Sequence, residues 1–286
     1  MRLYRSFTSQ EEIDREYNPS AAVVDSVAIA ARWAEDSARV REQSIIRLGL
    51  RYGPTVEEYL DFFSGGSGSP LHVFVHGGYW RRFTAREFSF VAAGLNREGV
   101  SVAVVNYALC PRVTIDEITR QARAAIAWLH THAKQLDCDP TRLTLSGHSA
   151  GGHLTAMALA TDWERDYDLP ADILKGGIPI SGLFDLGPFP YSYLQPALQL
   201  TWDQVHRNSP IHHVRGTAPP QLVAVGGAES AEFRRQSKEY ASICKGKGAE
   251  AQYFEIADAN HFTVLDALFD SESAAFARLL TVARAG

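Results

Sequence analysis

The stretch that decides the fold is Leu143-Thr-Leu-Ser-Gly-His-Ser-Ala-Gly-Gly-His153. It opens with alternating apolar residues, which are typical of the end of a strand, and the run from His153 to Ala160 is typical of a helix. Between the two stands a G-x-S-x-G sequence, Gly147-His148-Ser149-Ala150-Gly151. A serine on a sharp turn from strand to helix holds its hydroxyl clear of the backbone, as a nucleophile requires. We therefore predict that Ser149 is a catalytic nucleophile.

On both sides of this stretch the chain alternates between expected strands and expected helices. Further strands are expected at residues 71–76, 100–107, 177–181, 222–225 and 252–256. Helices are expected to begin near Thr84, Thr114, Ala231 and Val264. Strands joined by such helices form a mostly parallel sheet that is covered on both faces. Residues 44–52 and 56–63 flank Gly53-Pro54 and predict an antiparallel hairpin at the N-terminal edge of that sheet. The predicted fold is one α/β domain over residues 1–286.

Two segments lie outside this alternation. Residues 1–43 predict a helical arm, with a capping box at Ser9 and Glu12 and a break at Asn18-Pro19. Residues 183–213 predict a cap-like insertion over the site. Its aromatic side chains either stack on an aryl substrate or pack within an ordinary loop; they are Phe184, Phe189, Tyr191, Tyr193 and Trp202.

Partners for Ser149 are expected where later strands end, because functional residues gather at the carboxyl ends of parallel strands. His261 follows the strand at 252–256 and is the predicted base; the other nine histidines are less well placed. The preceding strand is followed by Glu229 and then by Glu232, so Glu229 is the predicted acid and Glu232 the alternative. The order nucleophile, acid, base is that of α/β-hydrolases.

The first central strand ends in His76-Gly-Gly-Tyr-Trp80. Paired glycines expose backbone N–H groups to a small reacting atom. Together with Ala150, the residue after the nucleophile, this turn can surround a carbonyl oxygen. Tyr79 and Trp80 are bulky, so we expect the site to favour a very small acyl group.

Composition narrows the possible partners. The net charge of −5 and the mixed signs do not suggest nucleic acid or an anionic membrane as a partner, and no apolar run approaches the ~20 residues of a membrane span. The three cysteines form no metal or disulfide pattern, so free thiols in a cytoplasmic protein are expected. The sequence contains no nucleotide-binding motif and no histidine spacing typical of a metal site, so no cofactor or metal is expected. A homodimer is compatible with these features.

Four places in the sequence resemble the kynurenine formamidase (arylformamidase) group of α/β-hydrolases. His76-Gly-Gly-Tyr-Trp80 is similar to the group's HGGxW motif, and the resemblance extends to residues 106–111, 229–237 and 260–263. It covers roughly residues 45–285. The resemblance implies that Ser149 is the nucleophile, His261 the base and Glu229 the acid. It also implies an oxyanion hole made of N–H groups, those of Gly78, Tyr79 and Ala150. Many members carry Asp where this chain has Glu229.

The activity that this resemblance implies is hydrolysis of N-formyl-L-kynurenine to kynurenine and formate. Two alternatives stay open: a carboxylesterase acting on short-chain aryl esters, and a catalytically silent hydrolase fold used for binding. The residues expected to contact the substrate are Tyr79, Trp80, His148 and Phe184. Arg81 and Arg82 either meet a substrate carboxylate or are solvated at the surface.

Overall fold

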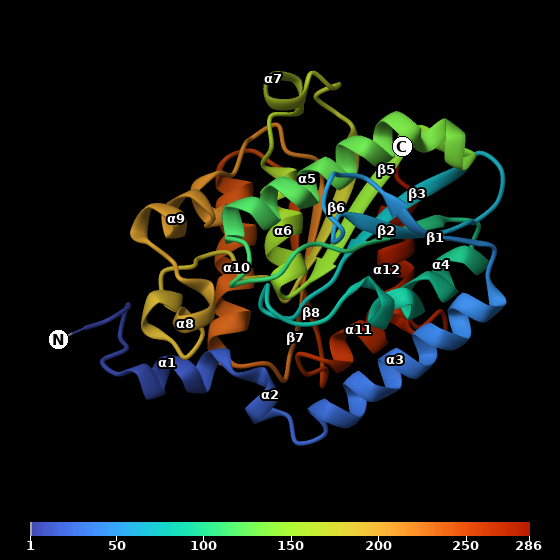
Figure 1. The fold of residues 1–286 in the computed structure, drawn as a ribbon. Coiled ribbons are helices and arrows are strands. Elements are labelled where there is room, and N and C mark those ends of the chain that lie inside the picture. Colours follow the sequence, from blue (N-terminus) through green and yellow to red (C-terminus); the bar gives the residue numbers. More distant parts are fainter. Residues whose placement is uncertain (1) are drawn as a thin grey trace.

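The computed structural model describes residues 2–286, which form an eight-stranded sheet with helices on both faces (Figure 1). The strands are β1 Ile46–Arg51, β2 Tyr59–Phe63, β3 Ser69–Val75, β4 Ser101–Val105, β5 Cys138–His148, β6 Leu174–Ile180, β7 Gln221–Gly226 and β8 Ala251–Ile256. Their order in the sheet is β1-β2-β4-β3-β5-β6-β7-β8. β2 is antiparallel to β1 and to β4, and the other neighbours are parallel. The predicted α/β-hydrolase sheet, with its antiparallel N-terminal edge, is confirmed.

The helices cover the sheet in two layers. The α-helices are α1 Gln10–Tyr17, α2 Pro19–Ala22, α3 Ser26–Gln43, α4 Ala92–Arg97, α5 Ile115–His132, α6 Ala150–Leu159, α7 Trp163–Tyr167, α8 Gln195–Leu198, α9 Trp202–Arg207, α10 Ala231–Gly246, α11 Thr263–Phe269 and α12 Ala274–Ala283. Short 3-10 helices are η1 Ala85–Val91, η2 Ala133–Leu136, η3 Phe189–Tyr191 and η4 Pro210–His212. α5 and α6 share one core with the sheet, and α3, α4, α11 and α12 share the other.

The central strand β3 contributes side chains to both hydrophobic cores. Val73 and Val75 belong to the first core and Phe74 to the second, because successive side chains of a strand point to opposite faces. All three are fully or almost fully buried. Such a strand reads as a continuous apolar run rather than an alternating one, as expected for a parallel sheet covered on both sides.

Several helix boundaries differ from the prediction. The helix expected from Thr84 keeps its capping box but starts as the 3-10 helix η1 before it becomes α4. The single helix expected from Val264 to Ala283 is two helices, because Ser273 caps α12 by accepting a hydrogen bond from the N–H of Phe276. The helix after Ser149 begins three residues earlier than expected, at Ala150.

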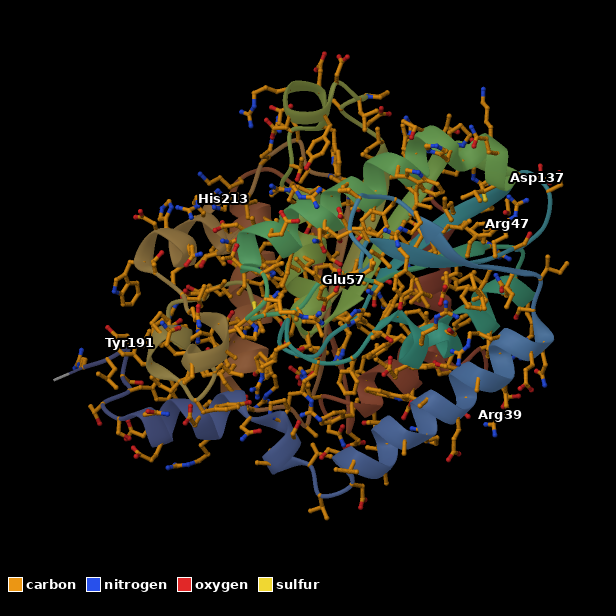
Figure 2. All side chains as sticks on the ribbon, viewed as in Figure 1. Arg39, Arg47, Glu57, Asp137, Tyr191 and His213 are labelled. Carbon is orange, nitrogen blue, oxygen red and sulfur yellow. The ribbon has the colours of Figure 1, made fainter. Side chains whose placement is uncertain are left out.

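The first helix of the N-terminal arm lies beside the insertion, where Asp14 accepts a hydrogen bond from the backbone N–H of Tyr193. α1, α2 and α3 run along the lower edge of the view in Figure 1, with α8 above α1 and α11 beside α3. The predicted arm began at residue 1, which lies outside the described residues. The insertion at 183–213 folds into η3, α8, α9 and η4, and Tyr191 and His213 mark it in Figure 2. Within residues 2–286, none of the helices is both long and apolar enough to cross a bilayer.

Candidate active site

Ser149 stands on a strained turn between β5 and α6, with φ 56° and ψ −114°. Two glycines make the turn possible. A Cβ atom on Gly151 would lie 2.0 Å from the carbonyl oxygen of Val75, and one on Gly147 would lie 2.3 Å from the carbonyl oxygen of Gly151. Since backbone atoms cannot yield by that much, both positions require glycine where strand and helix cross. The local sequence therefore holds Ser149, which is 2% exposed, on a sharp strand-to-helix turn with the geometry of a nucleophile elbow.

Glu229 and His261 form a buried hydrogen-bonded pair beside this turn. The Nδ1 atom of His261 lies 2.6 Å from Oε2 of Glu229. The other carboxylate oxygen accepts hydrogen bonds from the hydroxyl of Ser181 at 2.5 Å and from the N–H of Gly226 at 2.8 Å. Both carboxylate oxygens are therefore engaged, and the imidazole is held in one orientation.

Ser181 was missed by the sequence reasoning. It follows β6 directly and adopts φ 48°, and its N–H donates to the carbonyl oxygen of Ala224 on β7. The only signal that could have found it is its place at the carboxyl end of a parallel strand. It is a positioning residue, because it touches Glu229 and not the cavity.

His148 lies against the catalytic histidine candidate. Its Nε2 is 2.8 Å from the carbonyl oxygen of His261, and the two ring centroids are 4.7 Å apart. Complete burial, and then the neighbouring imidazole of His261, lower the pKa of His148 well below 6.5. The neutral ring therefore carries its proton on Nε2 and donates it to that carbonyl, which fixes the backbone of the residue that carries the base.

The turn after β3 supplies backbone N–H groups. Gly78 has φ 111° and Tyr79 has φ 51°, and within residues 2–286 neither N–H donates a hydrogen bond. Ala150 is the first residue of α6, so its N–H has no partner inside the helix. A Cβ atom on Gly78 would lie 2.3 Å from the carbonyl oxygen of Arg82, so glycine is required there for space as well as for φ. These three residues are the ones predicted from the sequence to form an oxyanion hole.

Ser149 and His261 open into one cavity of about 260 Å³. Its lining consists of Asn18, Pro19, Ser20, Trp33, Gly77, Gly78, Tyr79, Arg81, Arg82, Phe83, Phe88, His148, Ser149, Tyr193, His261 and Phe262. The predicted substrate contacts Tyr79 and His148 are therefore in the wall. The cavity brings together a serine hydroxyl, an imidazole and unpaired N–H groups, and an arrangement of this kind can carry out acyl transfer through a tetrahedral intermediate.

Trp80 and Phe184, which were expected to contact the substrate, do not line the cavity, so this expectation is corrected. Trp80 is fully buried behind the turn, where its Nε1–H donates to Nδ1 of His153 at 3.2 Å. Phe184 is fully buried against Tyr240, with the rings stacked at 4.2 Å. Phe184 belongs to a separate hydrophobic cluster with Tyr240, and neither side chain lines the cavity.

Of the aromatic residues in the insertion, only Tyr193 lines the cavity. Phe189 packs behind Tyr79, with ring centroids 6.0 Å apart, and is fully buried. Trp202 contacts the ring of Tyr191 and is 58% exposed, so it points away from the site. The insertion therefore contributes one aromatic wall and packs mostly within itself.

The N-terminal arm supplies part of the cavity wall, which the sequence did not indicate. Asn18, Pro19 and Ser20 line the cavity, and the hydroxyl of Tyr79 donates to the carbonyl oxygen of Tyr17 at 2.5 Å. The turn after β3 is thereby tied to the arm.

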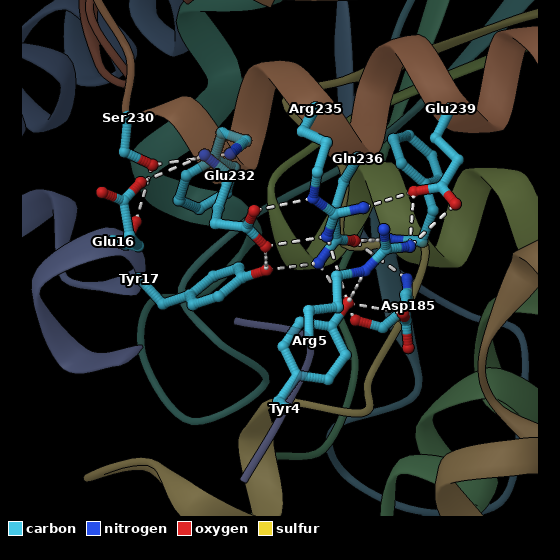
Figure 3. Close-up of polar contacts among 12 residues, drawn as sticks. Tyr4, Arg5, Glu16, Tyr17, Asp185, Ser230, Glu232, Arg235, Gln236 and Glu239 are labelled. Atoms are coloured by element: carbon cyan, nitrogen blue, oxygen red, sulfur yellow. Dashed lines mark hydrogen bonds and ion pairs between the residues drawn. The ribbon is translucent and has the colours of Figure 1, made fainter. Parts of the chain in front are cut away.

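A polar network fastens this arm to α10 (Figure 3). The hydroxyl of Tyr17 donates to Glu232 at 2.7 Å, and the hydroxyl of Ser230 donates to the carbonyl oxygen of Glu16 at 2.7 Å. The guanidinium of Arg235 donates hydrogen bonds of 2.7 Å to both carboxylate oxygens of Glu232. Burial raises the pKa of Glu232, but the hydrogen bonds from Arg235 and Tyr17 outweigh it and bring that pKa below 4.5. The carboxylate of Glu232, the alternative acid, is therefore bound by Tyr17 and Arg235 and fastens the arm to α10.

Within the described part of the chain, no group of three His, Cys, Asp or Glu side chains is placed to hold a metal ion.

Comparisons with known proteins find related hydrolases. Residues 60–174 match the model of the BD-FAE family. The chain is 32% identical over 276 residues to a kynurenine formamidase of Danio rerio, an alignment that covers 92% of each protein. It is 26% identical to the esterase LipQ of Mycobacterium tuberculosis, over 74% of this chain and 56% of that protein. The crystal structure of a proposed thioesterase from Silicibacter sp. TM1040 is 32% identical, has a TM-score of 0.83 and matches 96% of this chain and 99% of that one.

Proposed function

Because this chain belongs to the kynurenine formamidase family of α/β-hydrolases, we propose that it hydrolyses N-formyl-L-kynurenine to L-kynurenine and formate. The observation that carries the proposal is the buried Glu229–His261 pair, whose imidazole lines one small cavity together with Ser149. A serine nucleophile, an oriented base and N–H donors are the parts that amide hydrolysis by acyl transfer requires.

The proposed reaction has two halves. His261 takes the proton of Ser149 as its oxygen attacks the formyl carbon, and the N–H groups of Gly78, Tyr79 and Ala150 stabilise the oxyanion. The C–N bond then breaks as the imidazolium returns the proton to the anilide nitrogen, which releases kynurenine and leaves a formyl ester on the serine. Water attacks this ester with His261 again as the base, and formate leaves as the serine regains its proton.

The cavity favours a small acyl group on a flat aryl amine. Its volume of about 260 Å³ lies just under the ~300–1,000 Å³ of ordinary ligand pockets. Trp33, Phe83 and Tyr193 give it aromatic walls on which an aryl ring can stack. Tyr79 stands beside the oxyanion site with its hydroxyl fixed to the arm, so it cannot move aside easily for a longer acyl chain.

A carboxylesterase acting on short-chain aryl esters is the second candidate. The same groups would cleave such esters, and the similarity to the esterase LipQ favours it. A catalytically silent binding protein is the third reading, and the intact set of serine, histidine, carboxylate and N–H donors argues against it. As its setting we propose the cytoplasm, because Cys110, Cys138 and Cys244 are all unpaired and buried.

A series of acyl groups separates the first two candidates. We would measure kcat/KM for the formyl, acetyl, propionyl and butyryl esters of one phenol, divide each by its rate with hydroxide, and add N-formyl-L-kynurenine. Ser149→Ala gives the background. The proposal predicts the highest value for formyl, a graded fall of ~1–3 kcal/mol in transition-state stabilisation per methylene, and turnover of the formamide. Values that rise towards butyryl without formamide turnover would identify an esterase.

A further inference from the structure

Arg81 follows the oxyanion turn and lines the cavity, yet its guanidinium has no anionic partner. Its Nε is buried and, among residues 2–286, has no hydrogen-bond partner. No carboxylate of the described chain lies within ion-pair distance of it, whereas Arg235 and Arg120 are each held by two carboxylates. The guanidinium carbon lies 5.6 Å from the ring centroid of Tyr193. Arg81 is thus a positioned cation in the wall of the cavity.

The protein groups around Arg81 leave its Nε without a hydrogen-bond partner. Asp14, the carboxylate that meets Tyr193, accepts hydrogen bonds from the backbone N–H of Tyr193 at 2.8 Å and from the side chain of Gln10 at 3.1 Å. The Tyr79 hydroxyl is committed to the carbonyl oxygen of Tyr17. Leaving a buried hydrogen-bond donor unpaired costs free energy. An acceptor on a bound ligand would remove that cost, so the unpaired Nε of Arg81 suggests a ligand-binding role.

The neighbouring Arg82 has a different environment. It also lines the cavity, but its side chain is exposed and its guanidinium carbon lies 5.4 Å from the ring centroid of Phe83. An exposed cation is screened by water and keeps its hydrogen-bond partners there. The two arginines therefore have the same charge and adjacent positions but differ in burial, which makes them a matched pair for an experiment.

We infer that Arg81 is a specificity-determining residue that binds a carboxylate on the leaving group of the substrate. This rests on the proposed function, since N-formyl-L-kynurenine carries a carboxylate at the end of its amino-acid side chain. With the formyl carbon at Ser149, the aryl ring would lie between the aromatic walls and the carboxylate would reach the guanidinium. The planar fork of arginine binds a carboxylate through two parallel hydrogen bonds, which lysine cannot reproduce.

The test compares two formanilides in wild type, Arg81→Met, Arg81→Lys and Arg82→Met. One is N-formyl-L-kynurenine; the other is N-(2-acetylphenyl)formamide, which keeps the formyl anilide and the ketone but lacks the amino-acid end. The readout is the ratio of kcat/KM for the charged substrate to that for the neutral one. Arg81→Met should lower this ratio roughly 10- to 100-fold, mostly through KM, because a charge-assisted hydrogen-bonded pair is lost. Arg81→Lys should recover part of the ratio, and Arg82→Met should change it by less than about threefold.

Two results would overturn the inference. An equal loss on both formanilides in Arg81→Met would show that the arginine only supports the wall. An equal fall of the ratio in Arg82→Met and Arg81→Met would show a diffuse effect of net charge. If wild type turns over neither formanilide, the proposed function fails, and the inference is tested separately with phenyl acetate and the same ester bearing a carboxylate on a short ortho side chain.

Discussion

Replacing Glu229 by Gln removes the charge of the proposed triad acid and keeps its size. In the structure, one carboxylate oxygen accepts from the hydroxyl of Ser181 and the N–H of Gly226, and the other faces Nδ1 of His261. Only an oxygen can accept the first two bonds. The amide oxygen of the introduced glutamine must therefore take that place, and its NH₂ group must face the imidazole.

That NH₂ group cannot accept the proton on Nδ1 of His261. The ring then favours the other tautomer, with its proton on Nε2, and it can no longer accept the proton of Ser149. We expect kcat to fall by ~10⁴, the loss known for the corresponding change in other triads. This equals about 5.5 kcal/mol of activation free energy at about 1.36 kcal/mol for each factor of ten. KM should change little, because Glu229 does not line the cavity.

The assay follows the absorbance of kynurenine as it forms, and Glu232→Gln is the matched control. Glu232 is also buried, but its oxygens bind Arg235 and Tyr17. Its kcat should stay within about tenfold of wild type. Thermal unfolding of both variants checks that each is folded. If Glu229→Gln keeps kcat within tenfold of wild type, or if Glu232→Gln is the more damaging change, Glu229 is not the acid.

Two further predictions concern stability. Gly151→Ala should cost more than about 3 kcal/mol of unfolding free energy, since its Cβ would lie 2.0 Å from the carbonyl oxygen of Val75, whereas Gly246→Ala, with open space within 4 Å, should be neutral or slightly stabilising by urea unfolding. The pKa of Glu232 is lower in the folded protein than in the unfolded chain, so its stabilisation is present above about pH 4.5 and is lost as the pH falls through the lowered pKa. Urea midpoints should therefore drop more steeply below that pH in wild type than in Glu232→Gln, and parallel curves would contradict the role of Glu232.

The elbow and the sheet could be predicted because their determinants are local. Strand, glycine, serine and helix follow one another within residues 143–160, and the alternation of strands and helices fixes a parallel sheet. Chain order then selected Glu229 and His261, and the structure brings these two side chains together. The helix break at Ser273 escaped detection because the apolar spacing continues on both sides of it.

The walls of the site could not be predicted, since they depend on distant contacts. Tyr17 and Glu232 are 215 residues apart, and a helical pattern in the arm shows which face is apolar but not what that face covers. Trp80 was expected beside the substrate because it follows Tyr79 in sequence. Both residues adopt positive φ, 51° for Tyr79 and 55° for Trp80. This conformation is uncommon for residues other than glycine and cannot be predicted from their sequence. As a result, the indole of Trp80 points inward and donates a hydrogen bond to His153.

The central claim is that Ser149 forms the acyl intermediate of a formamidase. The most direct test is titration of the protein with a fluorophosphonate, which displaces fluoride when an activated serine attacks it, followed by peptide mass analysis and an assay of N-formyl-L-kynurenine hydrolysis on the same samples. We predict one adduct per chain, located on Ser149, and formamidase activity that falls to zero in proportion to labelling. An adduct on another residue, or hydrolysis that persists in fully labelled protein, would contradict the claim.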